Sequence, residues 1–213
     1  GHHSAAIQLM TKYEVTIEQA PGFYMQWLVG QQKFAEAEKT KAEADYRAAQ
    51  KLLRDALASP EAEKDLLSAS ECRYTLGWCN YRLKSHVAAG TSFQEAVGGL
   101  RGPNPSKAAE AAWMAFVSYQ AIANEQPRYG LRAIEVLEDL KRDFPNHAYA
   151  QKADYFIAKL QQSRGSTSSS IRQLQAIDPA DPNYVSARLD LCNLLRRQID
   201  QAPSDDEKRE LAQ

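Results

Sequence analysis

Histidine side chains are the first candidates for metal binding or acid–base catalysis in this chain of 213 residues. His86 and His147 each stand alone, and neither has a partner at the His-x-x-x-His or Cys-x-x-Cys spacing that metal sites use. The sequence also contains no Gly-x-Ser-x-Gly nucleophile motif, no phosphate-binding glycine loop and no nucleotide-binding fingerprint. These observations predict a protein that is not an enzyme and that uses no cofactor and no metal.

Three cysteines are present, which is an odd number. Cys72 and Cys79 lie seven residues apart, a separation of about 10 Å along a helix axis, which is too far for a disulfide. We expect all three cysteines to be reduced and to be buried as small apolar side chains. This leaves the location open between the cytoplasm and the periplasm.

Aromatic residues recur at helical spacing within residues 71–100, where Tyr74, Trp78 and Tyr81 would follow one stripe of a helix. Aromatic side chains offer a large contact area and a polar tip at little entropic cost, which suits a binding surface. The other interpretation is that such a stripe packs in the core, or that a terminal helix covers it. Both interpretations are open at this point.

Helices are expected throughout the chain, since strand and hairpin signals are nearly absent. Ser59-Pro60 with two acids behind it, and Asp181-Pro182, are typical helix starts. The charged segment AEAEKTKAEADYR admits either a break or one continuous helix. The predicted helices span residues 5–19, 22–42, 44–58, 60–84, 87–99, 106–124, 129–143, 147–163, 168–177 and 183–200.

The second helices of successive pairs repeat one spacing. Counted from a first small residue, a large apolar residue follows at the fourth position and another apolar residue at the seventh. Small residues let two helices approach closely, and the large residue fills the groove between them. Recurrence of this pattern predicts stacked helical hairpins. The residues are Ala49, Leu53 and Ala56; Ala89, Phe93 and Ala96; Ala133, Leu137 and Leu140; and Ser170, Leu174 and Ile177.

These residues, with Leu76-Gly77 twelve positions before Ala89, resemble the tetratricopeptide repeat (TPR) family over roughly residues 22–201. In style, residues 112–120 and 132–160 are similar to repeats of the bacterial Tol-Pal coordinator and outer-membrane assembly lipoproteins. The resemblance implies an all-α, right-handed α-solenoid of stacked antiparallel helical hairpins with about ten helices. One departure is the spacing of eighteen residues from Ala115 to Ala133, which predicts a longer helix or loop at ANEQPRYG.

In the TPR family the first helix of each pair lines a concave groove that contacts peptides. The resemblance therefore implies a protein–protein interaction scaffold that binds a peptide segment, with the basic residues favouring an acidic partner. The alternative is an architectural, spacer or self-associating segment of a larger bacterial envelope or multidomain protein. Carried onto this sequence, the partner-binding residues are Tyr74, Trp78, Tyr81, Arg82, Phe116, Tyr119, Tyr155, Lys159, Arg196 and Arg197. The wider stripe adds Gln120, Lys152 and Asn193, and a looser alignment adds Tyr24, Trp27 and Phe34.

Composition is that of an ordinary globular protein, with 44% apolar residues, 25% charged residues and a net charge of −1. This charge balance gives no net electrostatic attraction for nucleic acid, and no apolar run is long enough for membrane insertion.

Residues 1–4, GHHS, are typical of a tag remnant, and a single repeat domain is expected over residues 5–203. A capping box at Ser204 predicts the start of a further helix or a frayed tail over 204–213, and the chain is either a fragment of a longer protein or complete. The oligomeric state is open.

Overall fold

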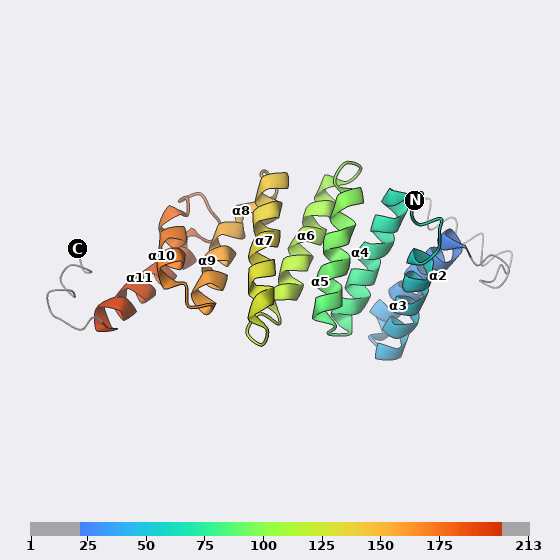
Figure 1. Ribbon diagram of the computed structural model, residues 1–213, viewed down its shortest axis with the longest axis horizontal. Coiled ribbons are helices and arrows are strands. Elements are labelled where there is room, and N and C mark those ends of the chain that lie inside the picture. The colour runs from blue at the N-terminus through green and yellow to red at the C-terminus, as the bar shows by residue number, and fades with distance from the viewer. Residues whose placement is uncertain (1–21, 202–213) are drawn as a thin grey trace. The chain divides into compact units, whose positions relative to one another are not determined.

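Helices make up the architecture of the computed structural model, which describes residues 22–201 (Figure 1). This part of the chain contains ten helices and no strand, which confirms the prediction of an all-α protein of stacked helical hairpins. The predicted helix 5–19 and the segment 204–213 lie outside the described residues. The helices are α2 (Phe23–Thr40), α3 (Glu43–Leu57), α4 (Leu66–Arg82), α5 (His86–Leu100), α6 (Pro105–Gln120), α7 (Pro127–Asp143), α8 (Ala148–Gln151), α9 (Ala153–Ser163), α10 (Thr167–Ala176) and α11 (Tyr184–Gln201).

Two units divide the chain after Ile122, and each is described by itself. Unit 1 holds α2 to α6 and unit 2 holds α7 to α11. A single repeat domain over residues 5–203 stays a prediction. Among the described helices, none is long and apolar enough to cross a membrane.

The turns that follow α2 and α4 in unit 1 each contain a lysine in the left-handed backbone region. Lys41 follows α2 and Lys84 follows α4, and both have φ of 57°. The Lys41 amide donates to the carbonyl oxygen of Ala37 at 2.7 Å, which closes the last turn of α2. The charged segment is therefore broken into two helices and does not form one continuous helix.

The helix predicted over residues 60–84 begins later in the structure, as α4. Residues 60–64 form turns, and α4 begins at Leu66 because Asp65 caps it, accepting a hydrogen bond from the Ser68 amide at 3.0 Å. An aspartate at the N-cap satisfies an amide that the first helical turn leaves without a partner. In addition, Ala62 is buried against the core, so this turn is part of the packing of unit 1.

The repeated spacing predicts the core positions correctly. Ala89, Phe93 and Ala96 are fully buried on α5, as are the matching residues of α3. Gly77 faces Phe93 across the α4–α5 hairpin, and a Cβ at Gly77 would lie 2.7 Å from the Phe93 ring. The glycine is therefore required by close approach of the two helices.

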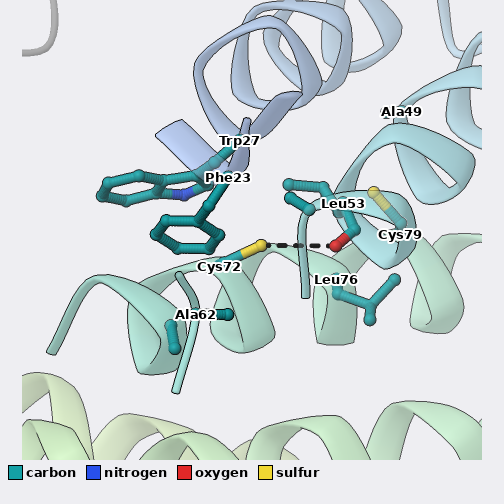
Figure 2. Close-up of a cluster of buried hydrophobic side chains, with 10 residues drawn as sticks. Phe23, Trp27, Ala49, Leu53, Ala62, Cys72, Leu76 and Cys79 are labelled. Carbon is teal, nitrogen blue, oxygen red and sulfur yellow. Dashed lines mark hydrogen bonds between the residues drawn. The ribbon is translucent and has the colours of Figure 1, made fainter. Parts of the chain in front are cut away.

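A cluster of buried apolar side chains joins α2, α3 and α4 (Figure 2). Phe23 and Trp27 stack with ring centroids 5.7 Å apart, and both lie beside Leu53 and Cys72. The Cys72 thiol donates to the carbonyl oxygen of Leu53 at 3.5 Å. The cluster fixes α2 against the α3–α4 pair, and this placement positions the site described below.

In unit 2, the predicted helix 147–163 is divided at Lys152 into α8 and α9. The Lys152 amide bonds to the carbonyl oxygen of Tyr149, three residues back, so the α-helical ladder is interrupted there. His147 is the N-cap of α8, and its Nδ1 accepts from the Tyr149 amide at 3.3 Å. The core of α9, α10 and α11 is built from Ala158, Ile171, Leu174, Ile177, Ala187, Leu191 and Leu194.

Residues 121–125 form turns between α6 and α7, and Gln126 is the N-cap of α7. The extra spacing after Ala115 is therefore a loop, and the predicted extension of a helix to residue 124 is wrong. α7 begins instead at Pro127, where the missing amide hydrogen of proline has no cost because first-turn amides have no helical partner.

Candidate functional site

A cleft of about 270 Å³ lies between α2 and α4 in unit 1, and we refer to it as the aromatic cleft. Aromatic rings from both helices form its sides, and a charged pair closes one end. The side chains of the cleft come from two helical stripes of the same type, an aromatic residue followed four positions later by a charged one. The lining residues are Phe34 and Glu38 of α2, with Tyr74, Thr75, Trp78 and Arg82 of α4.

The rings of α4 are held in place from beneath by Phe93 of α5. The centroid of the Phe93 ring lies 5.7 Å from that of Tyr74 and 5.5 Å from that of Trp78, both in edge-to-face geometry. Edge-to-face pairs are the favoured arrangement of aromatic rings. Because Phe93 is fully buried and Tyr74 and Trp78 are only half-buried, the outer sides of these two rings are available at the surface.

The charged end of the aromatic cleft is an ion pair between Arg82 and Glu38. The guanidinium donates from Nε and Nη2 to the two carboxylate oxygens at 2.8 and 3.1 Å. Lys41 Nζ and the Tyr46 hydroxyl also donate to this carboxylate, at 2.8 and 2.7 Å. Partial burial alone would raise the pKa of Glu38, but the hydrogen bonds from Lys41, Arg82 and Tyr46 outweigh it and lower the pKa to about 2.

Cations of the chain already lie over both rings of α4. The Arg82 guanidinium carbon is 5.6 Å from the centroid of the Trp78 ring, and Lys107 Nζ of α6 is 4.9 Å from that of Tyr74. Lys107 is held there by Glu71, at 3.3 Å. The cation–π contacts of these two rings are therefore made by residues of the chain itself. The part of each ring that remains open presents apolar surface.

Three predicted site residues of unit 1 do not line the aromatic cleft. Phe116 and Tyr119 are core residues, with 1% and 3% of their surface exposed. Tyr119 packs onto Gly90 of α5, where a Cβ would lie 2.5 Å from the ring. Phe116 and Tyr119 are therefore not accessible to a partner in the folded chain. Tyr81 is half-buried between Trp78 and His86, with ring centroids 6.0 and 5.7 Å away.

The wider stripe of α2 is also divided by burial. Trp27 is buried in the apolar cluster, while Tyr24 is exposed and its hydroxyl donates to Asp65 at 2.9 Å. Only Phe34 of the three reaches the aromatic cleft. Glu38 and Thr75 were not predicted. The signal for Glu38 is its place one turn after Phe34, matching that of Arg82 one turn after Trp78.

Two of the predicted basic residues of unit 2 line a second hollow, of about 500 Å³, which we refer to as the cationic hollow. Lys159 and Arg197 line it, whereas Arg196 points elsewhere and has an exposed side chain 3.9 Å from Asp200. The Asp190 carboxylate accepts from Lys159 Nζ at 2.9 Å and from the Tyr155 hydroxyl at 3.0 Å. Burial, followed by this hydrogen bond, raises the pKa of Tyr155. The remaining lining residues, which were not predicted, are Gln162, Ser163, Thr167, Leu194, Gln198 and Gln201.

Within residues 22–201, no group of three or more His, Cys, Asp and Glu side chains is arranged to hold a metal ion. Neither the aromatic cleft nor the cationic hollow contains a histidine or cysteine among its lining residues. The aromatic cleft presents ring surface, and the cationic hollow presents cationic and amide donors.

Comparison with known proteins finds similarity to solved structures, one of which is a TPR protein. No protein-family model matches the sequence, and no curated protein matches it. The chain is similar to the crystal structure of a thermophilic TPR protein of Thermus thermophilus, with 21% sequence identity and a TM-score of 0.37. That similarity covers 86% of this chain and 97% of the other. The resemblance to Tol-Pal coordinator and outer-membrane assembly lipoprotein repeats stays a prediction.

Proposed function

We propose that this protein is a protein–protein interaction scaffold that binds a segment of a partner protein, with an apolar side chain of that segment inserted into the aromatic cleft. The observation that carries the proposal is the set of half-buried rings of Phe34, Tyr74 and Trp78 around one hollow. Aromatic pockets of this kind are typical sites for the anchor residue of an interface.

The size of the aromatic cleft supports a side chain as its occupant. At about 270 Å³ it is smaller than the roughly 300–1,000 Å³ of pockets that enclose a whole small molecule. Its cation–π positions are filled by Arg82 and Lys107, which disfavours a basic side chain. The Glu38 carboxylate has donors from three side chains, so it offers little to a further cation.

The decisive experiment fills the cleft without touching the core. Replacing Trp78 would remove a contact with Phe93 and disturb folding, whereas Thr75 lines the cleft from the surface of α4. Thr75→Arg should block the cleft, and Ala48→Arg on the exposed side of α3 adds the same charge elsewhere. Pull-downs from lysate with the parent chain and both variants, each shown to be folded by circular dichroism, are compared by quantitative mass spectrometry.

The proposal expects at least one protein that the parent and Ala48→Arg recover equally and that Thr75→Arg loses. Equal recovery by all three chains would mean that the aromatic cleft does not bind a partner. Loss with both variants would indicate a general effect of charge and would also contradict the proposal.

A second candidate function is an architectural or self-associating segment, and one observation favours it. Val185 and Leu189 lie one turn apart on α11, with 81% and 63% of their surface exposed. Exposed apolar residues side by side are a common mark of an interface. If copies of the chain associate through α11, Val185→Ser/Leu189→Ser should lower the sedimentation coefficient at high concentration. A coefficient that does not change with concentration in either chain would exclude this candidate.

A further inference from the structure

The cationic hollow of unit 2 carries an unbalanced positive charge. Lys159 and Arg197 both line it, and Lys159 is paired with Asp190 at 2.9 Å. Arg197 makes no ion pair with any residue in the described range 22–201, and its side chain is exposed. Counting Asp190 against the two cations leaves a net charge of about +1 at the hollow.

Neutral hydrogen-bond donors surround these two cations. The amides of Gln162 and Gln198 and the hydroxyl of Thr167 line the hollow, whereas the Ser163 hydroxyl on the same lining already donates to the carbonyl oxygen of Leu160 at 2.9 Å. Lys159 and Gln162 come from α9, Thr167 from the first turn of α10, and Arg197 from α11. Three helices that pack on one apolar core thus present donors to one space, so the arrangement does not depend on a loop.

We infer that the cationic hollow binds side-chain carboxylates of an acidic segment of a partner protein, with Arg197 as the main contact and Lys159 as the second. An arginine guanidinium forms paired hydrogen bonds with a carboxylate, and such charge-assisted bonds are about twice as strong as neutral ones. A net charge of about +1 matches a singly charged carboxylate better than a doubly charged phosphate. This inference is independent of the aromatic cleft, because all of its residues lie in unit 2.

The test uses the full chain and a defined probe, an acetylated and amidated tetraglutamate peptide, with the tetraglutamine peptide as the neutral control. Binding is followed by two-dimensional NMR of the 15N-labelled chain, which gives both an affinity and the residues that respond. Arg197→Gln is compared with Arg196→Gln, because these neighbours carry the same charge and only Arg197 lines the hollow. Lys159→Gln is the second variant of the hollow.

We expect tetraglutamate to shift amides of α9, α10 and α11, and tetraglutamine to shift none of them. Arg197→Gln should weaken the affinity about tenfold or more, the effect of losing one charge-assisted hydrogen bond. Arg196→Gln should change it less than about twofold, as expected for an exposed charge outside the site. Lys159→Gln should weaken binding as well.

Equal weakening by Arg196→Gln and Arg197→Gln would show general attraction of charge and overturn the inference, as would shifts spread over both units. The chain also contains acids of its own at Asp205, Asp206 and Glu207. If only the variant Asp205→Asn/Asp206→Asn/Glu207→Gln bound the probe, the chain itself would supply the carboxylates, and a partner segment would be excluded as the occupant.

Discussion

Arg82, the last residue of α4, holds the carboxylate of Glu38, which lies near the end of α2 and 44 residues earlier in the chain. The two bonds, at 2.8 and 3.1 Å, join the first helices of neighbouring hairpins at the same end. Both residues of the pair line the aromatic cleft. The contribution of the pair to stability is open to measurement through pH.

Stability should fall in acid partly through Glu38. The pKa of this carboxyl is about 2 in the folded chain, against an ordinary value of 4.5. A carboxyl whose pKa is lowered by folding stabilises the folded state above its ordinary pKa, and this stabilisation is lost as the pH falls from 4.5 towards 2. Urea unfolding over this interval should therefore show a shallower decline for Glu38→Gln than for the parent. Glu63→Gln, at an exposed carboxyl, serves as the control and should keep the parent's slope.

Two adjacent glycines of α5 should respond in opposite directions to alanine. A Cβ at Gly99 would meet Ser70 Oγ and lie 2.6 Å from the carbonyl oxygen of Leu66, whereas at Gly98 it would meet nothing within 4 Å. Gly99→Ala should lower the free energy of unfolding by about 1–3 kcal/mol through overpacking. Gly98→Ala should raise it by up to about 1 kcal/mol, because alanine favours a helix. Chemical denaturation measures both free energies of unfolding. Changes of the same sign in the two variants would contradict the close approach of Gly99 to Leu66 and Ser70 of α4.

Asn80 of α4 is the buried polar residue that links three successive helices. It is 1% exposed, its Oδ1 accepts from Gln50 Nε2 of α3 at 2.6 Å, and its Nδ2 donates to Ser92 Oγ of α5 at 3.1 Å. Asn80→Ala leaves buried groups without a partner and should cost about 2–3 kcal/mol of unfolding free energy. Ser92→Ala removes one of the two bonds and should cost less, about 1 kcal/mol. An effect of Asn80→Ala below about 0.5 kcal/mol, typical of surface sites, would argue against the link.

The three cysteines should differ in reactivity. Burial raises the pKa of the Cys72 and Cys79 thiols to about 12. Cys192 is exposed, so the prediction that all three cysteines are buried is wrong for this residue. Because the thiolate is the reactive form, a thiol reagent such as DTNB should modify one cysteine in the folded chain and three in denaturant. Cys192→Ser should leave the folded chain unreactive. Rapid modification of more than one cysteine under native conditions would show that α4 opens readily.

The sequence pattern predicts the helices and their core faces because both follow from local spacing. Ala89, Phe93 and Ala96 are fully buried as their repeat predicts. The residue at which a helix begins is harder to predict from the sequence, since Ser59 and Asp65 are both favourable N-cap residue types. The structure uses Asp65, and the turn before it buries Ala62, a tertiary contact that local spacing does not encode.

Which aromatic residues remain at the surface depends on the neighbouring helix and not on the stripe itself. Trp78 and Tyr119 both lie on the predicted stripe, yet Tyr119 is covered because Gly90 lets the next helix approach. The pairing of Glu38 with Arg82 is likewise a contact between hairpins, with no counterpart in local spacing. Residues such as Arg196 and Arg197 differ only in the side of α11 on which they fall, and the offset of one residue moves a side chain by about 100° around a helix.

In unit 1 each helix packs mainly against the helices that precede and follow it directly in the chain. Such short-range contacts favour rapid folding, and domains fold progressively as a chain leaves the ribosome. Every residue of the aromatic cleft, and the Phe93 ring beneath it, precedes Leu100. The cleft can therefore be complete on a nascent chain before unit 2 has been synthesised, so a partner that binds there could engage the protein during its translation.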